Sequence, residues 1–194
     1  MDSPITNGYS NAMLEHATRH LGPASGFQPP VDGEGFAVAF HQINPLQNTA
    51  LTLGVPFEPG ARARIEFACS LQAGQESEAY HLVRLVARWF LSGDDSVDFG
   101  EWIQTPQPMI PDTAIHGLLF DSYPHGNETR FSVFDGAVWP DGADIPLRIF
   151  ALIPLTRPEI EVLEDPGQGR EALWKRWREE ETEIWDIHRT GAGG

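Results

Sequence analysis

Residues 147–164 read L-R-I-F-A-L-I-P-L-T-R-P-E-I-E-V-L-E, and this stretch decides the fold. Its first half is apolar on both faces of an extended chain, which is typical of a strand buried inside a sheet. Thr156 can cap a helix, Pro158 suits the first helical turn, and Glu159 follows Thr156 at capping-box spacing. The sequence therefore predicts a central strand, a tight turn and a helix from about Arg157. Nothing in this stretch points to chemistry.

The chain has 194 residues, which is enough for one sizeable hydrophobic core. No run approaches the roughly 20 apolar residues of a membrane span. The N-terminus carries no signal-peptide pattern, so we expect a cytoplasmic protein. We assign residues 12–189 to a single domain, with a flexible N-terminus at residues 1–11 and a flexible tail at residues 190–194. Cys69 is the only cysteine, which excludes an intramolecular disulfide, and its spacing predicts a small core residue.

The net charge of −15 is the strongest signal in the composition. It argues against nucleic-acid binding, because neutralising phosphates requires clustered lysine and arginine. We expect no membrane partner either. A basic protein would be attracted to this chain, although acidic surfaces also keep proteins soluble.

The N-terminal part of the chain predicts one helix and a group of strands. Residues 12–21 have helical apolar spacing, and residues 24–35 form a connection rich in proline and glycine. Residues 36–43, 49–55 and 62–70 predict three strands, and their short turns favour an antiparallel meander.

The third of these strands has the clearest period-two alternation in the chain. We expect one side of it to face the core and the other to face solvent. The inward set is Ala63, Ile65, Phe67 and Cys69, and the outward set is Arg62, Arg64, Glu66 and Ser70.

Residues 77–91 predict the best amphipathic helix, with an apolar stripe from Tyr80 to Leu91. The loop that follows carries several aspartates beside Phe99 and Trp102. Its spacing departs from that of a calcium-binding EF-hand loop. The loop is either a plain solvated connection or an acidic contact surface that carries aromatic side chains.

The second half alternates extended segments with loops before the final helices. Residues 103–112 contain too many prolines for a central strand. Residues 117–122 and 130–134 each predict a short strand, and we expect these two to pair. After the helix that begins near residue 157, residues 170–183 predict a second amphipathic helix.

The chain contains no motif that identifies an enzyme, such as a nucleophile elbow, a phosphate-binding loop or a dinucleotide fingerprint. His16 and His20 lie four residues apart and could bind a metal, but no third ligand has a diagnostic spacing. We interpret them as surface histidines. Glu159 and Glu161 are expected to be solvated on a helix surface. We therefore predict no catalytic, cofactor-binding or metal-binding residues.

Several motifs together resemble the suppressor of fused domain in its single-domain bacterial form. They include T-A-L-T-L-G-V at residues 49–55, P-Q-P-M-I-P-D-T at residues 106–113, and I-P-L-T-R-P-E at residues 153–159. G-R-E-A-L-W at residues 169–174 and D-I-H-R at residues 186–189 follow in the order of that family. The chain departs from the family after T-L-G, where Val-Pro stands in place of a small polar residue, and at Asp-Pro before the last helix.

The resemblance implies a single α+β domain with a mixed, largely antiparallel sheet and flanking helices. It also implies action through protein contacts without a catalytic centre. Animal members of the family sequester a transcription factor by adding its peptide as a strand, and bacterial members look like immunity proteins against toxins. The animal peptide groove involves a second domain that this chain lacks, so its residues are not transferred.

We therefore predict a non-catalytic protein-binding module, specifically an acidic immunity or antitoxin protein that neutralises a basic toxin domain. The alternatives are an enzyme or metal-binding protein that uses dispersed histidines and aspartates, and a peptide-sequestering regulatory domain. No cofactor is expected. The candidate partner-binding residues are Asp94, Asp95, Asp98, Glu101, Trp102, Glu179, Glu180, Glu181 and Glu183.

Overall fold

The computed structural model describes residues 4–31, 33–93, 97–123, 128–136, 139 and 145–190. Within these residues the chain forms an α+β domain built on one eight-stranded sheet. The helices are α1 (Pro4–Leu21), η1 (Val55–Phe57, a 3-10 turn), α2 (Glu76–Ser92), α3 (Glu128–Phe131), α4 (Arg157–Glu164) and α5 (Gly169–Glu179). The strands are β1 (Ala24–Gln28), β2 (Ala37–Asn44), β3 (Gln47–Leu53), β4 (Ile65–Gln72), β5 (Trp102–Gln104), β6 (Ile115–Asp121), β7 (Val133–Phe134) and β8 (Leu147–Thr156).

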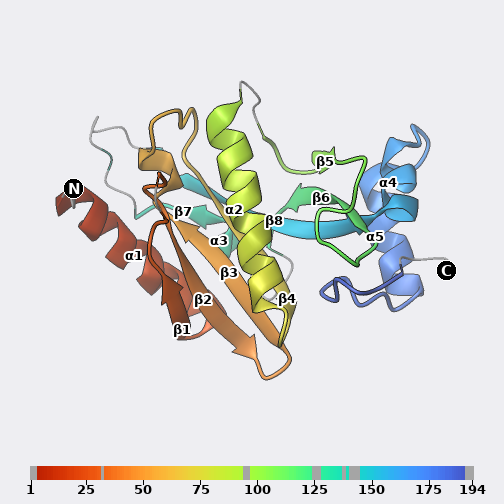
Figure 1. Cartoon of the computed structure of the whole chain (residues 1–194), viewed down its shortest axis with the longest axis horizontal. Helices are drawn as coiled ribbons and strands as arrows, with labels where there is room; N and C mark the ends of the chain where they lie inside the picture. The colour runs from red at the N-terminus through yellow and green to blue at the C-terminus, as the bar shows by residue number, and fades with distance from the viewer. Residues whose placement is uncertain are drawn as a thin grey trace.

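The strand order is β1-β2-β3-β4-β8-β6-β5, and β7 pairs with one end of β8. Every pairing is antiparallel except that of β4 with β8. The predicted meander is confirmed as β2-β3-β4, and the proline-rich segment begins at the edge strand β5, as its composition requires. Figure 1 shows α2 crossing one face of the sheet, with α4 and α5 at the far end of β8.

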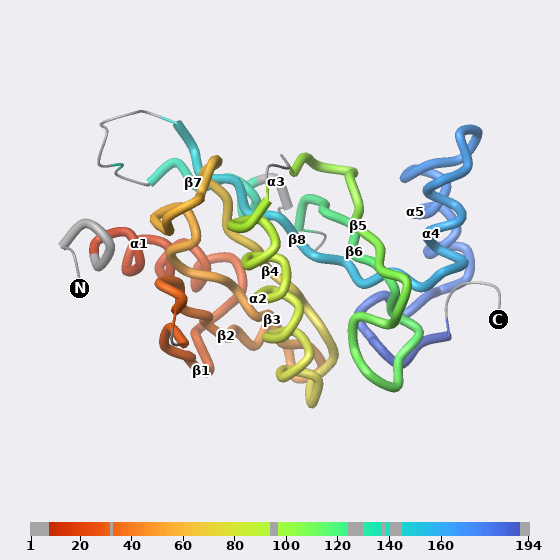
Figure 2. The backbone as a smooth tube through the Cα atoms, turned by 45° about the horizontal axis from the view of Figure 1, so that its top comes forward, coloured from red at the N-terminus to blue at the C-terminus, as the bar shows by residue number. Residues whose placement is uncertain are grey.

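Strand β8 is the central strand that the sequence predicts. All of its residues are buried except the half-buried Arg148, and the strand supplies side chains to all three core clusters. Phe150 packs under α2, Ile149 under α1, and Ile153 against α4 and α5. Figure 2 shows the same arrangement, with α1 and the α4–α5 pair at opposite ends of the molecule.

The helix after β8 begins where the sequence predicts. Thr156 is the N-cap residue, and its backbone N–H donates to the Glu159 side chain at 2.7 Å. The expectation that Glu159 is solvated is wrong, because Glu159 is fully buried, whereas Glu161 is exposed as expected. α5 lies across Glu159, and the indole N–H of Trp177 donates to it at 2.8 Å.

Arg189 completes the environment of Glu159. Its guanidinium lies 3.1 Å from the Glu159 carboxylate, and both side chains are almost fully buried. Arg189 also donates to the carbonyl of Ile184 at 2.9 Å and to that of Pro154. The β4–β8 ladder ends at Ala151, so the Pro154 carbonyl of β8 lies beyond the pairing with β4 and accepts a hydrogen bond from Arg189 instead. A proline is tolerated there because no β4 strand lies opposite its missing N–H.

The sheet is buried on both faces, which overturns part of the expectation for β4. Glu66 and Ser70, expected in solvent, are buried because α1 covers the face opposite α2. α1 also begins at Pro4 instead of residue 12, so residues 4–11 are helical, and Tyr9 is buried. The buried, inward position of Cys69 is confirmed, and burial raises the pKa of its thiol well above the usual value.

Two further expectations about strands are wrong. The connection at residues 24–35 contains β1, which pairs with β2. The segment at residues 130–134 pairs through Val133–Phe134 with β8 and not with β6, and it starts inside the short helix α3. In both cases the strand pairs with the next strand along the chain, and local propensity does not encode that pairing.

Glu66 is a buried carboxyl held by hydrogen bonds from several elements. It accepts from the Tyr9 hydroxyl at 2.7 Å, the Thr52 hydroxyl at 2.5 Å and the Gly54 backbone N–H at 2.5 Å. Burial raises the pKa of Glu66 to about 7, against the opposing effect of these donors. Burial and the adjacent Glu66 charge also raise the pKa of Tyr9.

We expect Arg189→Met to destabilise the fold strongly. The change leaves Glu159 buried without its cation, and breaking such a pair costs about 3–5 kcal/mol of unfolding free energy. Urea unfolding followed by circular dichroism measures this loss. Lys175→Met is the control, because its pair with Glu179 is mostly exposed and such pairs contribute about 0–1 kcal/mol.

The double variant Glu159→Gln/Arg189→Met should lose less stability than Arg189→Met alone, since no charge remains buried without a partner. An Arg189→Met protein within about 1 kcal/mol of the wild type would contradict a central role for this pair.

Glu66 should make folding stability depend on pH. Its folded pKa of about 7 lies above the usual glutamate value of 4.5, so between these two values the folded state retains a proton that the unfolded state has lost. The contribution of Glu66 to stability therefore falls as pH rises through this window, by up to about 3 kcal/mol. We expect Glu66→Gln to remove this fall in urea unfolding at successive pH values.

The control variant is Glu161→Gln, which changes an exposed carboxyl. It should retain the slope of the wild type between about pH 5 and 7. Parallel pH profiles for the wild type and Glu66→Gln would show that Glu66 does not titrate in this range.

Candidate protein-binding surface

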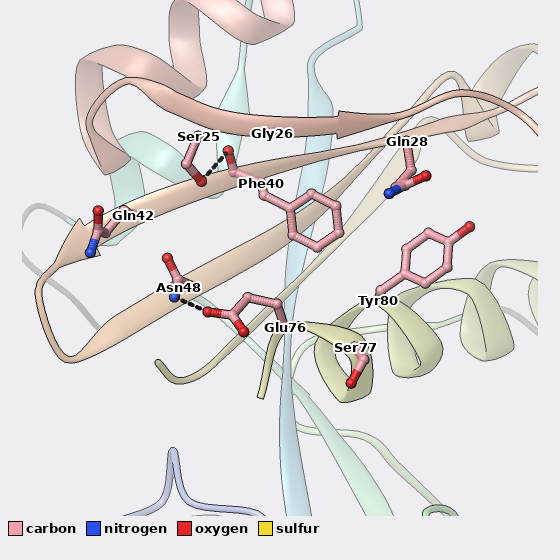
Figure 3. A pocket seen from close by; sticks show the side chains of 9 residues that line it. All are labelled: Ser25, Gly26, Gln28, Phe40, Gln42, Asn48, Glu76, Ser77 and Tyr80. Carbon is pink, nitrogen blue, oxygen red and sulfur yellow. Dashed lines mark hydrogen bonds between the residues drawn. The ribbon is translucent and has the colours of Figure 1, made fainter. Parts of the chain in front are cut away.

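A groove of about 600 Å³ opens between the edge strand β1, the strand β2 and the start of α2 (Figure 3). We call it the strand–helix groove. It is lined by Ser25, Gly26, Gln28, Phe40, Gln42, Asn48, Glu76, Ser77 and Tyr80.

Two aromatic rings form the apolar part of this groove. The ring centroids of Phe40 and Tyr80 lie 6.1 Å apart at an interplanar angle of 40°. Gly26 pairs with Phe40 across β1 and β2, and a Cβ atom at Gly26 would meet the Phe40 ring at 3.5 Å. Because Gly26 has no side chain, the Phe40 ring faces the open groove. Such a surface suits apolar or cationic side chains of a ligand.

The polar part of the groove has a fixed geometry and one formal charge. Glu76 is the only charged side chain among the lining residues that the structure describes. Its Oε1 atom accepts hydrogen bonds from the Asn48 side chain and from the backbone N–H of Gly74, the latter at 3.0 Å. The Ser25 hydroxyl donates to the carbonyl of Phe40 at 3.3 Å. Figure 3 shows these groups around the aromatic pair.

Strand β1 adds an exposed edge to the groove. All five of its residues are exposed, and the Phe27 side chain is 55% exposed. β1 ends the sheet order, so one side of its backbone has no neighbouring strand among the described residues. An edge of this kind offers N–H and C=O groups to an added strand.

The predicted acidic loop is only partly available for contact with a partner. Asp94 and Asp95 lie outside the described residues. Asp98 pairs with Arg148 at 2.8 Å, and its backbone N–H donates to Glu101 at 2.7 Å. The carboxylates of Asp98 and Glu101 therefore stabilise the conformation of the loop.

Trp102 does not project from this loop as a contact residue. It is half-buried in β5 and packs against the cluster formed by β8, α4 and α5. The neighbouring Phe99 packs on Phe150, with ring centroids 4.4 Å apart. Both aromatic side chains of the predicted contact loop thus serve the core.

The predicted acidic run at residues 179–183 lies at the end of α5, which stops at Glu179 instead of residue 183. Glu181 adopts a positive φ of 51° in the turn that follows. The other three acids have partners on the protein surface. Glu179 lies 3.7 Å from Lys175, Glu180 lies 3.0 Å from Arg176, and Glu183 accepts from Gln72 at 2.7 Å.

The histidine pair has a structural environment. His16 is buried, contrary to the expectation of a surface position, and its Nε2 atom lies 3.1 Å from the carbonyl oxygen of Phe131. Burial lowers the pKa of both His16 and His20. Among the residues that the structure describes, no group of three or more histidine, cysteine or acidic side chains could hold a metal ion. None of the described helices is long and apolar enough to cross a membrane.

Sequence reasoning missed the strand–helix groove because its parts are far apart in the chain. Gly26, Phe40 and Tyr80 meet only after β1 pairs with β2 and α2 packs on the sheet. The one local signal is an aromatic residue beside glycine in residues 24–28, which is too short to identify a strand.

Comparison with known proteins identifies a matching family and solved structures with a similar fold. The family model described as suppressor of fused protein (SUFU) matches residues 41–190. Among curated proteins, no sequence matches the chain significantly. A SUFU homolog from Neisseria gonorrhoeae FA 1090 has a similar structure, with a TM-score of 0.66, 18% identity, and 96% of this chain and 97% of that chain covered.

Two further solved structures share the fold. The Sufu–Fu complex crystal structure matches with a TM-score of 0.64 and 11% identity, over 95% of this chain and 92% of that chain. The Drosophila Suppressor of Fused matches with a TM-score of 0.61 and 11% identity, over 97% of this chain. The chain spans 51% of that longer protein.

Proposed function

Because the chain belongs to the suppressor of fused family, we propose that it is a non-catalytic protein-binding module, and specifically an immunity or antitoxin protein that neutralises a basic toxin domain. The observation that carries the binding role is the strand–helix groove, in which the Phe40 and Tyr80 rings lie beside Glu76, the one charged side chain among the described lining residues. A domain of the same fold takes part in the Sufu–Fu complex, which supports a role in protein association.

The charge of the chain supports the choice of a basic partner. The sequence has 28 acidic and 13 basic residues, so its field attracts cationic proteins and repels nucleic acid. An acidic inhibitor can occupy a cationic groove that a toxin uses for its own substrate. Charge complementarity of this kind acts mainly on the association rate.

A peptide-sequestering role is the second candidate, and the exposed edge of β1 favours it. A peptide strand could pair with β1 and place alternate side chains over Phe40 and Tyr80. This mode is compatible with an immunity role, because a toxin segment could be the added strand.

Association with the partner should depend strongly on salt. The product of the neighbouring gene provides the first candidate for co-purification at low and high salt. Because the Debye length falls from about 30 Å at 0.01 M to about 3 Å at 1 M, we expect the association rate constant to fall across this range. Reversing Asp94 and Asp95 to lysine should lower it further in stopped-flow measurements.

The control for that experiment reverses Glu15 and Glu161, which are exposed on α1 and α4 and give the same net charge. Asp98 is left unchanged because it pairs with Arg148. An unchanged rate on reversal of Asp94 and Asp95 would remove the loop from the interface, and the absence of any partner at either salt concentration would contradict the proposed function.

Filling the strand–helix groove should block binding without unfolding the protein. In Gly26→Leu the new side chain would lie over Phe40, and its Cβ contact of 3.5 Å is an ordinary packing distance. We expect the unfolding free energy to change by less than about 1 kcal/mol, while partner binding measured by calorimetry weakens.

The matched control is Gly8→Leu on α1, where an added Cβ meets nothing within 4 Å. It should leave binding unchanged. Full affinity in a stably folded Gly26→Leu protein would show that the partner binds elsewhere.

A further inference from the structure

A second groove, which we call the hairpin-tip groove, has a volume of about 770 Å³. It lies where the turn between β2 and β3 meets the end of β4 and the segment after α5. Its lining consists of Asn44, Pro45, Leu46, Gln47, Gln72, Ala73, Glu183 and Trp185.

Backbone hydrogen bonds hold these segments together. The N–H of Ala73 donates to the carbonyl of Leu46 at 2.8 Å, and the N–H of Gln72 donates to the carbonyl of Trp185 at 3.0 Å. The Asn44 side chain accepts from the N–H of Leu46 at 2.8 Å and donates to Gln47 at 3.0 Å. The walls of the groove are therefore fixed relative to one another before any ligand binds, which lowers the entropic cost of binding.

Leu46 is unusual for the tip of a hairpin. Its side chain is 75% exposed, the highest value for a large hydrophobic residue among those that the structure describes. Turn positions normally carry polar residues or glycine, and a side chain this exposed contributes little to folding. Leu46 thus offers apolar area to a partner, next to Pro45 and the half-buried Trp185.

Among the described residues that line this groove, Glu183 is the only charged side chain, and none is a lysine, arginine or histidine. Gln72 donates to its Oε2 atom at 2.7 Å and so orients the carboxylate. An ionised carboxylate has about four acceptor positions, so it retains capacity for a guanidinium. The indole of Trp185 in the same lining can stack on such a cation.

We propose that the hairpin-tip groove binds an arginine side chain of a protein partner, with the guanidinium on Glu183 and Trp185 and a neighbouring apolar side chain on Leu46. This inference rests on the proposed function and names the chemistry of the partner at one surface. Arginine fits better than lysine because its planar group binds a carboxylate in a bidentate manner and stacks on an aromatic ring.

The test uses the full chain and needs no natural partner. Nuclear magnetic resonance follows the Trp185 indole N–H and the Leu46 methyl groups during titration with the blocked dipeptide acetyl-leucyl-arginine amide. The Trp185 signal is assigned from the Trp185→Phe variant. We expect both sets of signals to shift with the arginine dipeptide and to shift much less with its citrulline and lysine counterparts, which lack the charge or the planar group.

Glu183→Gln should weaken binding of the arginine dipeptide at least about tenfold, because a charge-assisted hydrogen bond is lost. Leu46→Ser should also weaken it. The control variants are Glu179→Gln and Ile145→Ser, which change an exposed acid and an exposed apolar residue outside the groove. Equal shifts with arginine and citrulline, or full binding by Glu183→Gln, would overturn the inference.

Binding measurements with the natural partner then distinguish a failure of this inference from a failure of the proposed function. If a partner co-purifies and binds Glu183→Gln as tightly as the wild type, the groove assignment fails while the proposed function stands. If no partner is found but the dipeptide binds as described, the groove chemistry stands while the proposed function fails.

Discussion

The ion pair between Glu159 and Arg189 connects parts of the domain that are distant in sequence. Glu159 caps the helix that follows the central strand, and Arg189 comes from the last described segment of the chain. Arg189 also binds the carbonyl of Pro154, where the β4–β8 ladder has already ended. The motifs I-P-L-T-R-P-E and D-I-H-R, which carry the resemblance to the suppressor of fused family, meet at this pair. Removal of one charge alone would leave the other buried without a partner, so the fold tolerates the loss of one charge less well than the loss of both.

The sequence predictions that were confirmed rest on local patterns, whereas the burial predictions that were wrong concern residues that distant parts of the chain cover. The central strand, the helix start after Thr156, the meander and the edge position of the proline-rich segment follow from local patterns. The burial of Glu66 and Glu159 could not be predicted locally. Polar residues at alternate positions indicate a solvated face only when no helix covers that face, and Tyr9 and Trp177 reach these carboxylates from distant helices.

The partners of the predicted acidic residues could not be predicted from the sequence for a related reason. Sequence reasoning locates acidic residues but not their partners, and Asp98, Glu179 and Glu180 each pair with a cation of this chain. Glu183 differs, because its hydrogen-bond partner is the neutral Gln72 in a groove with no cation among its described lining residues. A carboxylate without an internal counter-ion can attract a cationic group from another molecule. Net charge therefore supports the proposal of a basic partner, whereas the pairing of each acid supports a proposal of where that partner binds.

Both grooves are built on the β2–β3 hairpin, and its register determines what each contains. Gln42 pairs with Asn48 and both line the strand–helix groove, while the next pair, Asn44 and Gln47, lines the hairpin-tip groove. β3 pairs with β4, and β4 pairs with the central strand β8. The hairpin is therefore fixed to the core of the sheet. The described lining of each groove then combines apolar area with one carboxylate and several amides, and includes no cation. A basic ligand with apolar side chains would fit both lining patterns, so the charge of the whole chain and the local chemistry of its grooves both support the proposed basic partner.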